Sequence, residues 1–569
     1  MARFFAAPPL RPALLFALLL LAGPNAAQAQ GKVKVRTKPA KAASAGAAAL
    51  SPEAPPPARP APADADWSVP YAGLVTAARL RTHLAVLASD AMEGRETGTP
   101  GQHRAAAYVA EQFKNAGLTG AMPDAADPYR QPFGVEQVSW ANGNFLQVGA
   151  TRFPWLADFY GFGDSPFAEV TTVQPVFVGY GIEQPGYSDY AGLDVRGRDV
   201  LLLLGEPTFP DGRARLSADG APTQWGADYR AKAELAGQKG ARAVFLVSFN
   251  AASNFAKQAA RLAPAVTQPT NGLVGEATGR GPAFFVSPAV GRAVLGTTEA
   301  ALQAYLTKVN AAKKPVASPF AVRPFQIQAV RRRTVLATEN VLGYVEGTDL
   351  KADVLVVSAH HDHLGMRNGQ VFNGADDDGS GTAAVINLAE AFAKAKQEGH
   401  GPRRGLLFLS VTGEEKGLFG SEYYAKHPAF PLARTVADLI VDMIGRTDPA
   451  HEGKPDYVYV IGSDKLASEL KVINEAQNAR YTQLALDYRF DDPADPNRFY
   501  YRSDHYNFAV HRVPVAFFFS GVHADYHRPG DDLEKIQFDK MERRARLVFH
   551  LAWELANREG RLVVDSDKP

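Results

Sequence analysis

The sequence predicts an α/β fold built on an open, mostly parallel sheet that helices cover. Four short and almost purely apolar runs follow residue 320 and read as strands: 354–358, 406–411, 439–441 and 513–520. Strands without polar positions are buried on both faces, which requires helices on either side of the sheet. Residues 382–396 and 539–557 have apolar positions at helical spacing and supply two of those helices. Strands that alternate with helices favour an open α/β sheet.

The first globular segment begins at Trp67 and extends to residue 143. Residues 74–87 and 105–118 carry apolar side chains at helical spacing, which predicts two helices. The turn-rich sequence SDAMEGRETGTPG lies between them and predicts a loop. We expect this segment to pack with residues 320–569 in one domain.

Residues 144–319 predict an inserted, β-rich domain with few helices. Its β-type runs are 175–182, 199–205 and 241–247. One helix-like segment, YRAKAELAGQKG, precedes the last of them, and many Gly and Pro residues separate the pieces. Gly- and Pro-rich boundaries suggest a unit that folds separately.

Residues 1–29 predict an export signal peptide. Arg3 and Arg11 accompany the apolar run ALLFALLLLA at residues 13–22, and Ala-Gln-Ala at 27–29 has the pattern of a cleavage site. The run is too short for a spanning helix, which needs roughly 20 residues. We therefore expect a periplasmic or extracellular protein without a membrane span. Residues 30–66 are rich in Pro and Ala and predict a disordered linker.

The composition excludes several classes of protein. Lys plus Arg number 61 and Asp plus Glu 60, so no excess of basic charge favours nucleic acid as a partner. The chain has no cysteine. Disulfide scaffolds, cysteine-ligated zinc, iron–sulfur clusters and thiol nucleophiles are therefore all excluded.

Histidines and carboxylates gather where the predicted strands end. The segment 359–363 (AHHDH) follows one strand, 412–415 (TGEE) follows the next, Asp442 ends a third, and His527 follows the last. Seven of the thirteen histidines fall within 360–363 and 505–527. Functional loops of open α/β sheets lie beyond the carboxyl ends of the strands. Each residue alone has a structural explanation, such as an N-cap or a solvated face, but the clustering predicts a metal site.

The residue types suit two divalent cations. Two neighbouring ions need a bridging carboxylate together with His, Asp and Glu ligands, and the sequence supplies this set with a glutamate to spare for proton transfer. There is no His-Glu-x-x-His helix. An EF-hand is excluded because residues 374–381 lack an acid at the first loop position. A Gly-x-Ser-x-Gly elbow is excluded because Asp378 stands where its first Gly would be.

Five ordered motifs identify a family. The strings SAHHDHLG, NGADDDGSGTAA, TGEEKGLFGS, DMIG and ADYHRPGD resemble the co-catalytic di-zinc exopeptidases, the aminopeptidase family related to glutamate carboxypeptidase and glutaminyl cyclase. LASDAMEGRETGTPG resembles the N-terminal segment of the same family, and the middle block resembles its protease-associated domain. The resemblance implies the zinc-exopeptidase type of sheet, with the protease-associated domain as an insertion.

The resemblance also implies roles for particular residues. His360 and Asp442 match ligands of the first zinc, and Asp377 matches the carboxylate that bridges both ions. The second zinc would be completed by Glu415 and His527. The family's remaining roles fall on three residues: the general base on Glu414, the acid that orients His360 on Asp362, and a carbonyl-polarising tyrosine on Tyr526. His361 departs from the family pattern, and His360 is preferred because it keeps the two-residue spacing to Asp362.

The implied activity is that of an exported, zinc-dependent aminopeptidase. It would use two Zn²⁺ per chain to activate the water that removes N-terminal residues from a peptide substrate. A metallo-carboxypeptidase remains open, because four arginines near the site could read a carboxyl terminus: Arg446, Arg498, Arg502 and Arg528. A glutaminyl-cyclase-like acyltransferase with one zinc also remains, as does a non-catalytic binding protein of the same fold.

Overall fold

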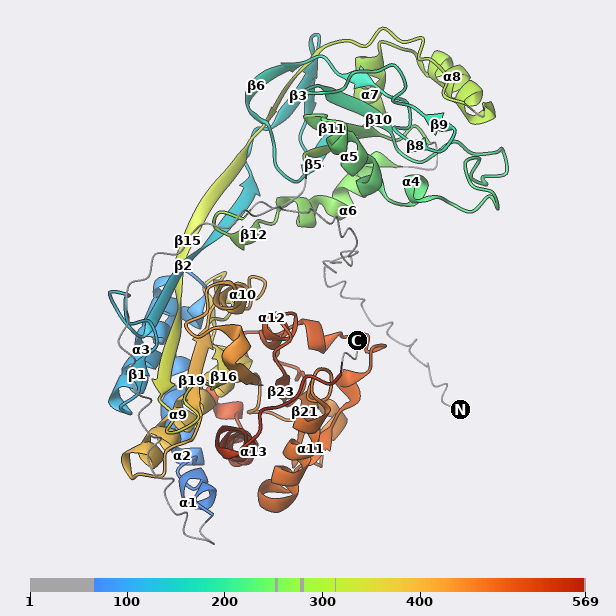
Figure 1. Ribbon diagram of the computed structural model, residues 1–569. Coiled ribbons are helices and arrows are strands. Elements are labelled where there is room, and N and C mark those ends of the chain that lie inside the picture. The colour runs from blue at the N-terminus through green and yellow to red at the C-terminus, as the bar shows by residue number, and fades with distance from the viewer. Residues whose placement is uncertain (1–65, 251–253, 277–280, 313, 567–569) are drawn as a thin grey trace, which may run out of the picture. The chain divides into compact units, whose positions relative to one another are not determined.

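The computed structural model describes residues 66–250, 254–276, 281–312 and 314–566 (Figure 1). Asp66–Pro569 forms one compact unit. The predicted signal peptide lies outside the described residues, as does the predicted linker apart from Asp66. Among the described helices, none combines the length and the apolar character that crossing a membrane requires.

Four parallel strands form the centre of a ten-stranded sheet. In spatial order they are β19 (Gly405–Val411), β16 (Val354–His360), β20 (Thr435–Val441) and β23 (Val515–Phe519). Every residue in all four is buried. These are the four strands that the apolar runs predict, so the expected α/β fold with an open, mostly parallel centre is confirmed.

Further strands extend the sheet on both sides. One side carries β15 (Arg331–Val345), β2 (Arg130–Trp140), β12 (Thr270–Leu273) and the short β1 (Thr119–Gly120). The other carries β21 (Tyr457–Ile461) and β22 (Ala485–Asp487). These strands join the parallel centre of the sheet through the antiparallel pairs β15–β19 and β21–β23. The pairing of β2 with β15 runs continuously from Arg130↔Val341 to Trp140↔Arg331.

Side chains of the central strands alternate between two cores. On β16, Leu355 and Val357 face one core, whereas Val354 and Val356 face the other. The first core is closed by the following helices (Figure 1): α2 (Ala77–Leu87), α3 (Pro100–Asn115), α9 (Gly381–Gln397) and α13 (Phe538–Asn557). The second is closed by α10 (Phe419–Lys426) and α12 (His505–Ala509). Two further helices, α1 (Ser68–Ala72) and α11 (Ser468–Gln477), pack against α13.

Two smaller sheets are built mostly from the segment that was expected to be an insertion. The five-stranded sheet has the order β5 (Phe159–Phe162), β13 (Ala283–Val286), β11 (Ala243–Val247), β10 (Asp199–Leu203) and β7 (Val176–Phe177). The four-stranded sheet has the order β4 (Thr151–Pro154), β3 (Phe145–Val148), β14 (Phe325–Ala329) and β6 (Phe167–Val173). Two short hairpins complete the strands: β8 (Glu183–Gln184) with β9 (Tyr187–Ser188), and β17 (Gly365–Arg367) with β18 (Gln370–Phe372).

This segment contains more helix than the sequence analysis expected. Its helices are α4 (Gln224–Ala227), α5 (Tyr229–Gln238), α6 (Phe255–Thr267), α7 (Pro288–Leu295) and α8 (Glu299–Ala311). Polar caps mark the starts of α6, α7 and α8, where Asn254, Ser287 and Thr298 accept backbone N–H groups of the first turn. These caps, rather than the Gly and Pro content, were the local signal of helix.

Strand β14 lies beyond the boundary expected at residue 319. It pairs with β3 through Ile327↔Leu146 and with β6 through Gln326↔Thr172, so it holds two strands of the four-stranded sheet together. Ala141 donates a backbone hydrogen bond to Val330, and Asn144 accepts one from Val330. These two hydrogen bonds join the ends of the segment between residues 141 and 330. The protease-associated type of this domain and its boundaries remain predictions.

We expect a fragment of residues 141–330 to unfold cooperatively on heating and a fragment of residues 141–319 to be less stable. The shorter one lacks Phe325 and Ile327, which are buried in β14, and burial of each such side chain contributes about 1.5–3 kcal/mol. Circular dichroism melting of both fragments measures the difference. Equal melting temperatures would show that β14 does not stabilise this sheet.

Candidate metal centre

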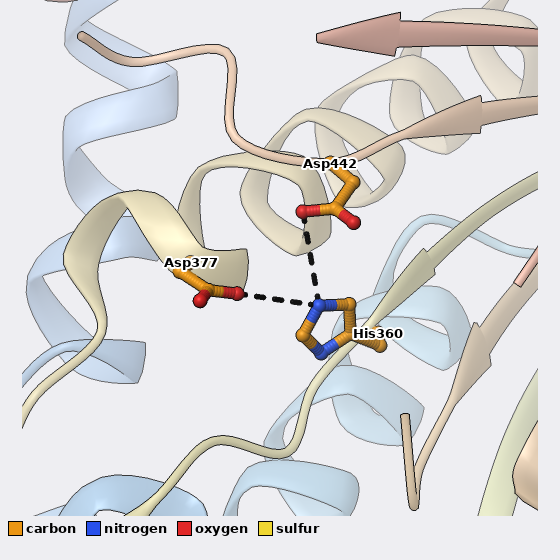
Figure 2. Close-up of side chains that lie close together, drawn as sticks. All are labelled: His360, Asp377 and Asp442. Atoms are coloured by element: carbon orange, nitrogen blue, oxygen red, sulfur yellow. Dashed lines mark ion pairs between the residues drawn. The ribbon is translucent and has the colours of Figure 1, made fainter. Parts of the chain in front are cut away.

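The candidate site lies at the carboxyl ends of three adjacent parallel strands. His360 is the last residue of β16, Glu414 and Glu415 follow β19, and Asp442 directly follows β20. The parallel register pairs His360 with Val411 and Ser358 with Ile440, so the three strands end at the same edge. Asp377 reaches this edge from the turn that precedes α9 (Figure 2).

The first group consists of His360, Asp377 and Asp442. The Nε2 atom of His360 lies 3.4 Å from Oδ1 of Asp377 and 3.8 Å from Oδ1 of Asp442 (Figure 2). All three residues are buried, and their facing atoms lie close enough together to share one metal ion. The Nδ1–H of His360 donates to the carbonyl oxygen of Asp362 at 3.1 Å, which leaves the lone pair of Nε2 for a metal.

The second group uses the other oxygen of Asp377. Oδ2 of Asp377 lies 3.0 Å from Nε2 of His527, which in turn lies 3.3 Å from Oε2 of Glu415. His363, which the sequence analysis did not assign, faces the same two carboxylates. Since its two oxygens face two different groups of donors, Asp377 has the position of a bridging carboxylate.

The donors fit zinc. Burial disfavours the charged form of His527, but Asp377 and Glu415 outweigh it and raise its pKa to about 10. Burial likewise opposes the imidazolium of His360, yet the surrounding carboxylates, Glu414 first, hold its pKa well above the ordinary value. The site therefore has a strong negative potential that a cation would neutralise. Imidazole nitrogens and carboxylate oxygens without sulfur are a donor set that zinc uses in catalytic sites.

Glu414 lies beside the first group without belonging to it. Its Oε2 is 4.0 Å from Nε2 of His360, and the side chain borders the pocket described below. Burial, reinforced by the charges of Glu415, Asp504 and Asp442, raises its pKa well above the usual range for a carboxyl group. A carboxyl group that borders the pocket without belonging to the metal donors can act as a general base or acid.

Asp362 lies on the far side of His360 from the metal-facing nitrogen. Its Oδ1 is 3.6 Å from Nδ1 of His360 and accepts a hydrogen bond from the backbone of Glu414 at 3.3 Å. Thr97 donates to Oδ2 at 2.7 Å. Asp362 thus fixes both His360 and the loop that carries Glu414. Thr97 comes from the N-terminal motif that the sequence analysis treated only as part of the resemblance.

Only the middle residue of the Asp376–Asp378 run faces the cluster. Asp378 accepts backbone hydrogen bonds from His360, Gly381 and Met443, and therefore connects the ends of β16 and β20 to the start of α9. Asp376 accepts from the backbone of Gly445 at 2.6 Å. The two flanking carboxylates hold the backbone that positions Asp377.

Buried Arg95 joins the N-terminal segment to the metal-facing loops. Its guanidinium donates to four carbonyl oxygens, those of Leu87, His361, Asn373 and Gly374. The segments 360–363 and 373–377 are therefore held to each other by one cation. The motif EGRETGTPG supplies this residue, which the sequence analysis did not single out.

His361 points away from the site. Its Nε2 accepts from the amide of Gln102 and its Nδ1 donates to the hydroxyl of Ser410, both at 3.0 Å. Burial lowers its pKa to about 3, so the ring is neutral. The structure therefore separates His361 from His360, the residue that faces Asp377 and Asp442.

An open pocket leads to the first group. One wall is apolar and is formed by Phe499, Phe517, Phe519 and Val522. Tyr526 borders the pocket and stacks on His527 with the ring centroids 3.9 Å apart. Burial raises the pKa of Tyr526 well above its usual value, so the hydroxyl keeps its proton.

Only one of the four candidate arginines lines this pocket. Arg502 lies at its edge, over the ring of Phe499. Arg446 pairs instead with Asp525 at 3.0 Å, and Arg498 lies over the ring of Tyr501. Arg528 is exposed and does not line the pocket.

Residues 340–552 match the family model described as Peptidase family M28. The chain is 28% identical to a probable zinc metalloprotease of Pyrenophora tritici-repentis over 38% of this chain and 51% of the relative. It is 29% identical to a probable leucine aminopeptidase of Trichophyton verrucosum over 36% of this chain and 54% of the relative. The chain spans about half the length of these curated relatives.

Two solved structures are similar in chain path. An aminopeptidase from Aneurinibacillus sp. strain AM-1 has a TM-score of 0.48 and 21% identity, covering 88% of this chain and 98% of that chain. A zinc aminopeptidase from Bacillus subtilis has a TM-score of 0.43 and 18% identity, covering 85% of this chain and 96% of that chain.

We expect Ser503→Ala to weaken zinc binding by about 10–100-fold, as loss of a hydrogen bond to a metal ligand typically does. Ser503 donates to Oδ2 of Asp442 at 2.7 Å and so fixes that carboxylate. Ser358→Ala is a matched control, because Ser358 donates at the same distance of 2.7 Å to Asp438, which is in neither metal group. Zinc affinity is measured by competition with a chromophoric chelator. Equal affinities in both variants would contradict the role of Asp442 as a ligand.

Proposed function

We propose that this protein is an exported, zinc-dependent aminopeptidase that removes N-terminal residues from peptides and holds two zinc ions per chain. The observation that carries the proposal is the position of Asp377, whose two carboxylate oxygens face two separate groups of metal donors. Export is proposed from the pattern of residues 1–29.

The donor atoms divide naturally between two ions. His360, Asp442 and Oδ1 of Asp377 would hold the first, and Glu415, His527 and Oδ2 of Asp377 the second. Bound zinc polarises a carbonyl group and lowers the pKa of water to about 7, so that hydroxide is available at neutral pH. Asp362 and Ser503 would keep His360 and Asp442 in orientation during turnover.

Glu414 is the residue of this chain that would move protons. It borders the pocket, lies in neither metal group, and has a raised pKa. In the proposed reaction its carboxylate takes the proton of the attacking water and returns it to the amine that leaves. Tyr526 keeps its phenolic proton and would donate it in a hydrogen bond to the substrate carbonyl oxygen as negative charge develops there.

The apolar wall supports cleavage from the N-terminus of the peptide and a preference for apolar N-terminal residues. An aminopeptidase must place the side chain of the first residue next to the metals, and Phe499, Phe517 and Phe519 provide an apolar surface there. The similarity to a probable leucine aminopeptidase also supports cleavage from the N-terminus. We therefore propose that bulky apolar N-terminal residues are preferred.

Arg502 supports a second candidate, a metallo-carboxypeptidase. It is exposed at the edge of the pocket and could pair with a C-terminal carboxylate. The similarity to a probable glutamate carboxypeptidase of Arthroderma benhamiae, 32% identical over 20% of this chain and 15% of the relative, is in line with this alternative.

We expect substitutions of the adjacent residues Glu414 and Glu415 to affect turnover and zinc content differently. Glu414→Gln removes the proton carrier and should lower turnover by about 10²–10⁴-fold, while the protein still binds about two zinc ions. Glu415→Gln removes a charged donor, so it should lose zinc from the second site, and added zinc should restore part of the activity. Turnover and bound zinc are measured side by side, the latter by elemental analysis.

The reverse result would exchange the roles of proton carrier and zinc ligand between Glu414 and Glu415. If Glu414→Gln lost zinc and Glu415→Gln kept it, Glu414 would be the ligand. One zinc in the wild type, unchanged by Asp442→Ala, would favour the cyclase-like alternative. Near-normal turnover in both glutamate variants would exclude this site as the active site.

We expect hydrolysis of Leu-Ala-Ala amide, which has a free N-terminus, and none of N-acetyl-Ala-Ala-Leu, which has only a free C-terminus. Glu-Ala-Ala amide should be cleaved more slowly than the leucyl peptide, because its charged side chain would face the apolar wall. Chromatography of the products measures all three reactions. Cleavage of the acetylated peptide, abolished in Arg502→Ala, would establish a carboxypeptidase, and release of ammonia from Gln-Ala-Ala amide would establish a cyclase.

A further inference from the structure

His363 is a fully buried histidine that faces the second group of donors. Its Nδ1 lies 2.9 Å from Oε1 of Glu415 and 3.8 Å from Oδ2 of Asp377. The side chain has no exposed surface, and neither ring nitrogen has a hydrogen-bond partner among the described residues. A buried imidazole left in this state costs free energy, so its position needs an explanation.

The carboxylate oxygens opposite His363 also lack hydrogen-bond partners among the described residues. Oδ2 of Asp377 and Oε1 of Glu415 are buried and make no hydrogen bond within the described part of the chain. The 2.9 Å approach of Nδ1 to Oε1 therefore lacks the geometry of a hydrogen bond. One nitrogen and two oxygens thus converge without satisfying one another. A cation shared by the three atoms would satisfy all of them, and they lie close enough together to bind one.

The ring of His363 is held in this orientation by its surroundings. The backbone N–H of His363 donates to the carbonyl of Arg95 at 3.1 Å. Gly374 packs directly on the ring, since a Cβ atom there would lie 2.4 Å from Cδ2 and 2.5 Å from Cγ of His363. The other side contacts His527 edge to face, with the ring centroids 5.9 Å apart. Both imidazoles therefore point toward Asp377 and Glu415.

We infer that His363 is a fourth protein ligand of the second zinc ion. The inference rests on the proposed two-zinc site and adds a residue to it. The second ion would then have donors from Asp377, Glu415, His363 and His527, whereas the first would have donors only from His360, Asp377 and Asp442.

The two zinc sites would consequently have different roles. Four protein donors close a zinc site and are typical of structural zinc, whereas three leave a position open for water or substrate. The second zinc is therefore the tightly held ion that fixes Asp377 and Glu415. The first is the weaker and more exchangeable ion, and it is the one that the pocket reaches through His360 and Asp442.

The alternative role for His363 is to orient Glu415 by a hydrogen bond. Loss of such an orienting residue weakens metal binding by about 10–100-fold but leaves the set of atoms on the metal unchanged. Loss of a ligand changes that set. Co²⁺ in place of zinc distinguishes the two roles, because its visible absorption depends on the number and type of its ligands.

The test is a Co²⁺ titration of the metal-free, full-length protein, read by visible absorption and by competition with a chelator. The wild type should show a tight and a weak site. His363→Ala should weaken the tight site by more than the roughly 100-fold limit of an orienting residue and alter its absorption spectrum. His361→Ala is the matched control, since it removes a neighbouring buried imidazole that bonds to Gln102 and Ser410, and it should keep both sites.

An unchanged spectrum at the tight site in His363→Ala would overturn the inference, as would equal affinities of the two sites in the wild type. If His363→Ala does not fold, His363→Gln fills the buried volume and is judged by the same two measurements. Because no peptide is hydrolysed in this experiment, its result is independent of whether the protein proves to be an aminopeptidase.

Discussion

The structure depends on the concentration of buried carboxylates at one edge of the central sheet. Asp377, Glu414, Glu415 and Asp442 are largely buried and lie around His360, His363 and His527. Burial of each charge costs several kcal/mol unless a partner of opposite charge is close. Arg95 and the histidines supply part of that charge, and divalent cations would supply the rest. The same charges that would destabilise the fold without metal are those that a two-metal site uses.

A network of backbone hydrogen bonds keeps these charges in place. Asp378 and Asp376 bind N–H groups from the ends of β16 and β20, and Arg95 binds carbonyl groups of the loops on the opposite side. These groups do not face the donor cluster, yet they determine where Asp377 and His363 point. A metal centre at the ends of parallel strands thus depends on residues that hold its backbone as well as on its ligands.

Residues 141–330 form two further sheets, and strand β12 of the same segment pairs with β2 in the ten-stranded sheet. They connect to the central sheet through the long antiparallel pairing of β2 with β15. Strands β2 and β15 lacked the purely apolar pattern of the central strands, because β15 begins with the exposed and charged sequence RRRT. Their pairing depends on contacts between residues some 200 positions apart, as Arg130↔Val341 illustrates, and local patterns do not report such contacts.

The sequence by itself determined the central strands, the main helices and the kinds of residue at the site. Apolar runs such as 354–358 can be satisfied only when both faces are buried, and the motifs around His360 and Glu414 stand directly after those runs. The spacing to Asp362 already favoured His360 over His361, but only the tertiary structure showed that His363 also faces the donors. His361 accepts a hydrogen bond from Gln102. The ring of His363 packs against Gly374 and faces Glu415. The direction of a side chain in a loop is set by contacts with distant segments, and adjacent residues of the same type therefore reach different environments.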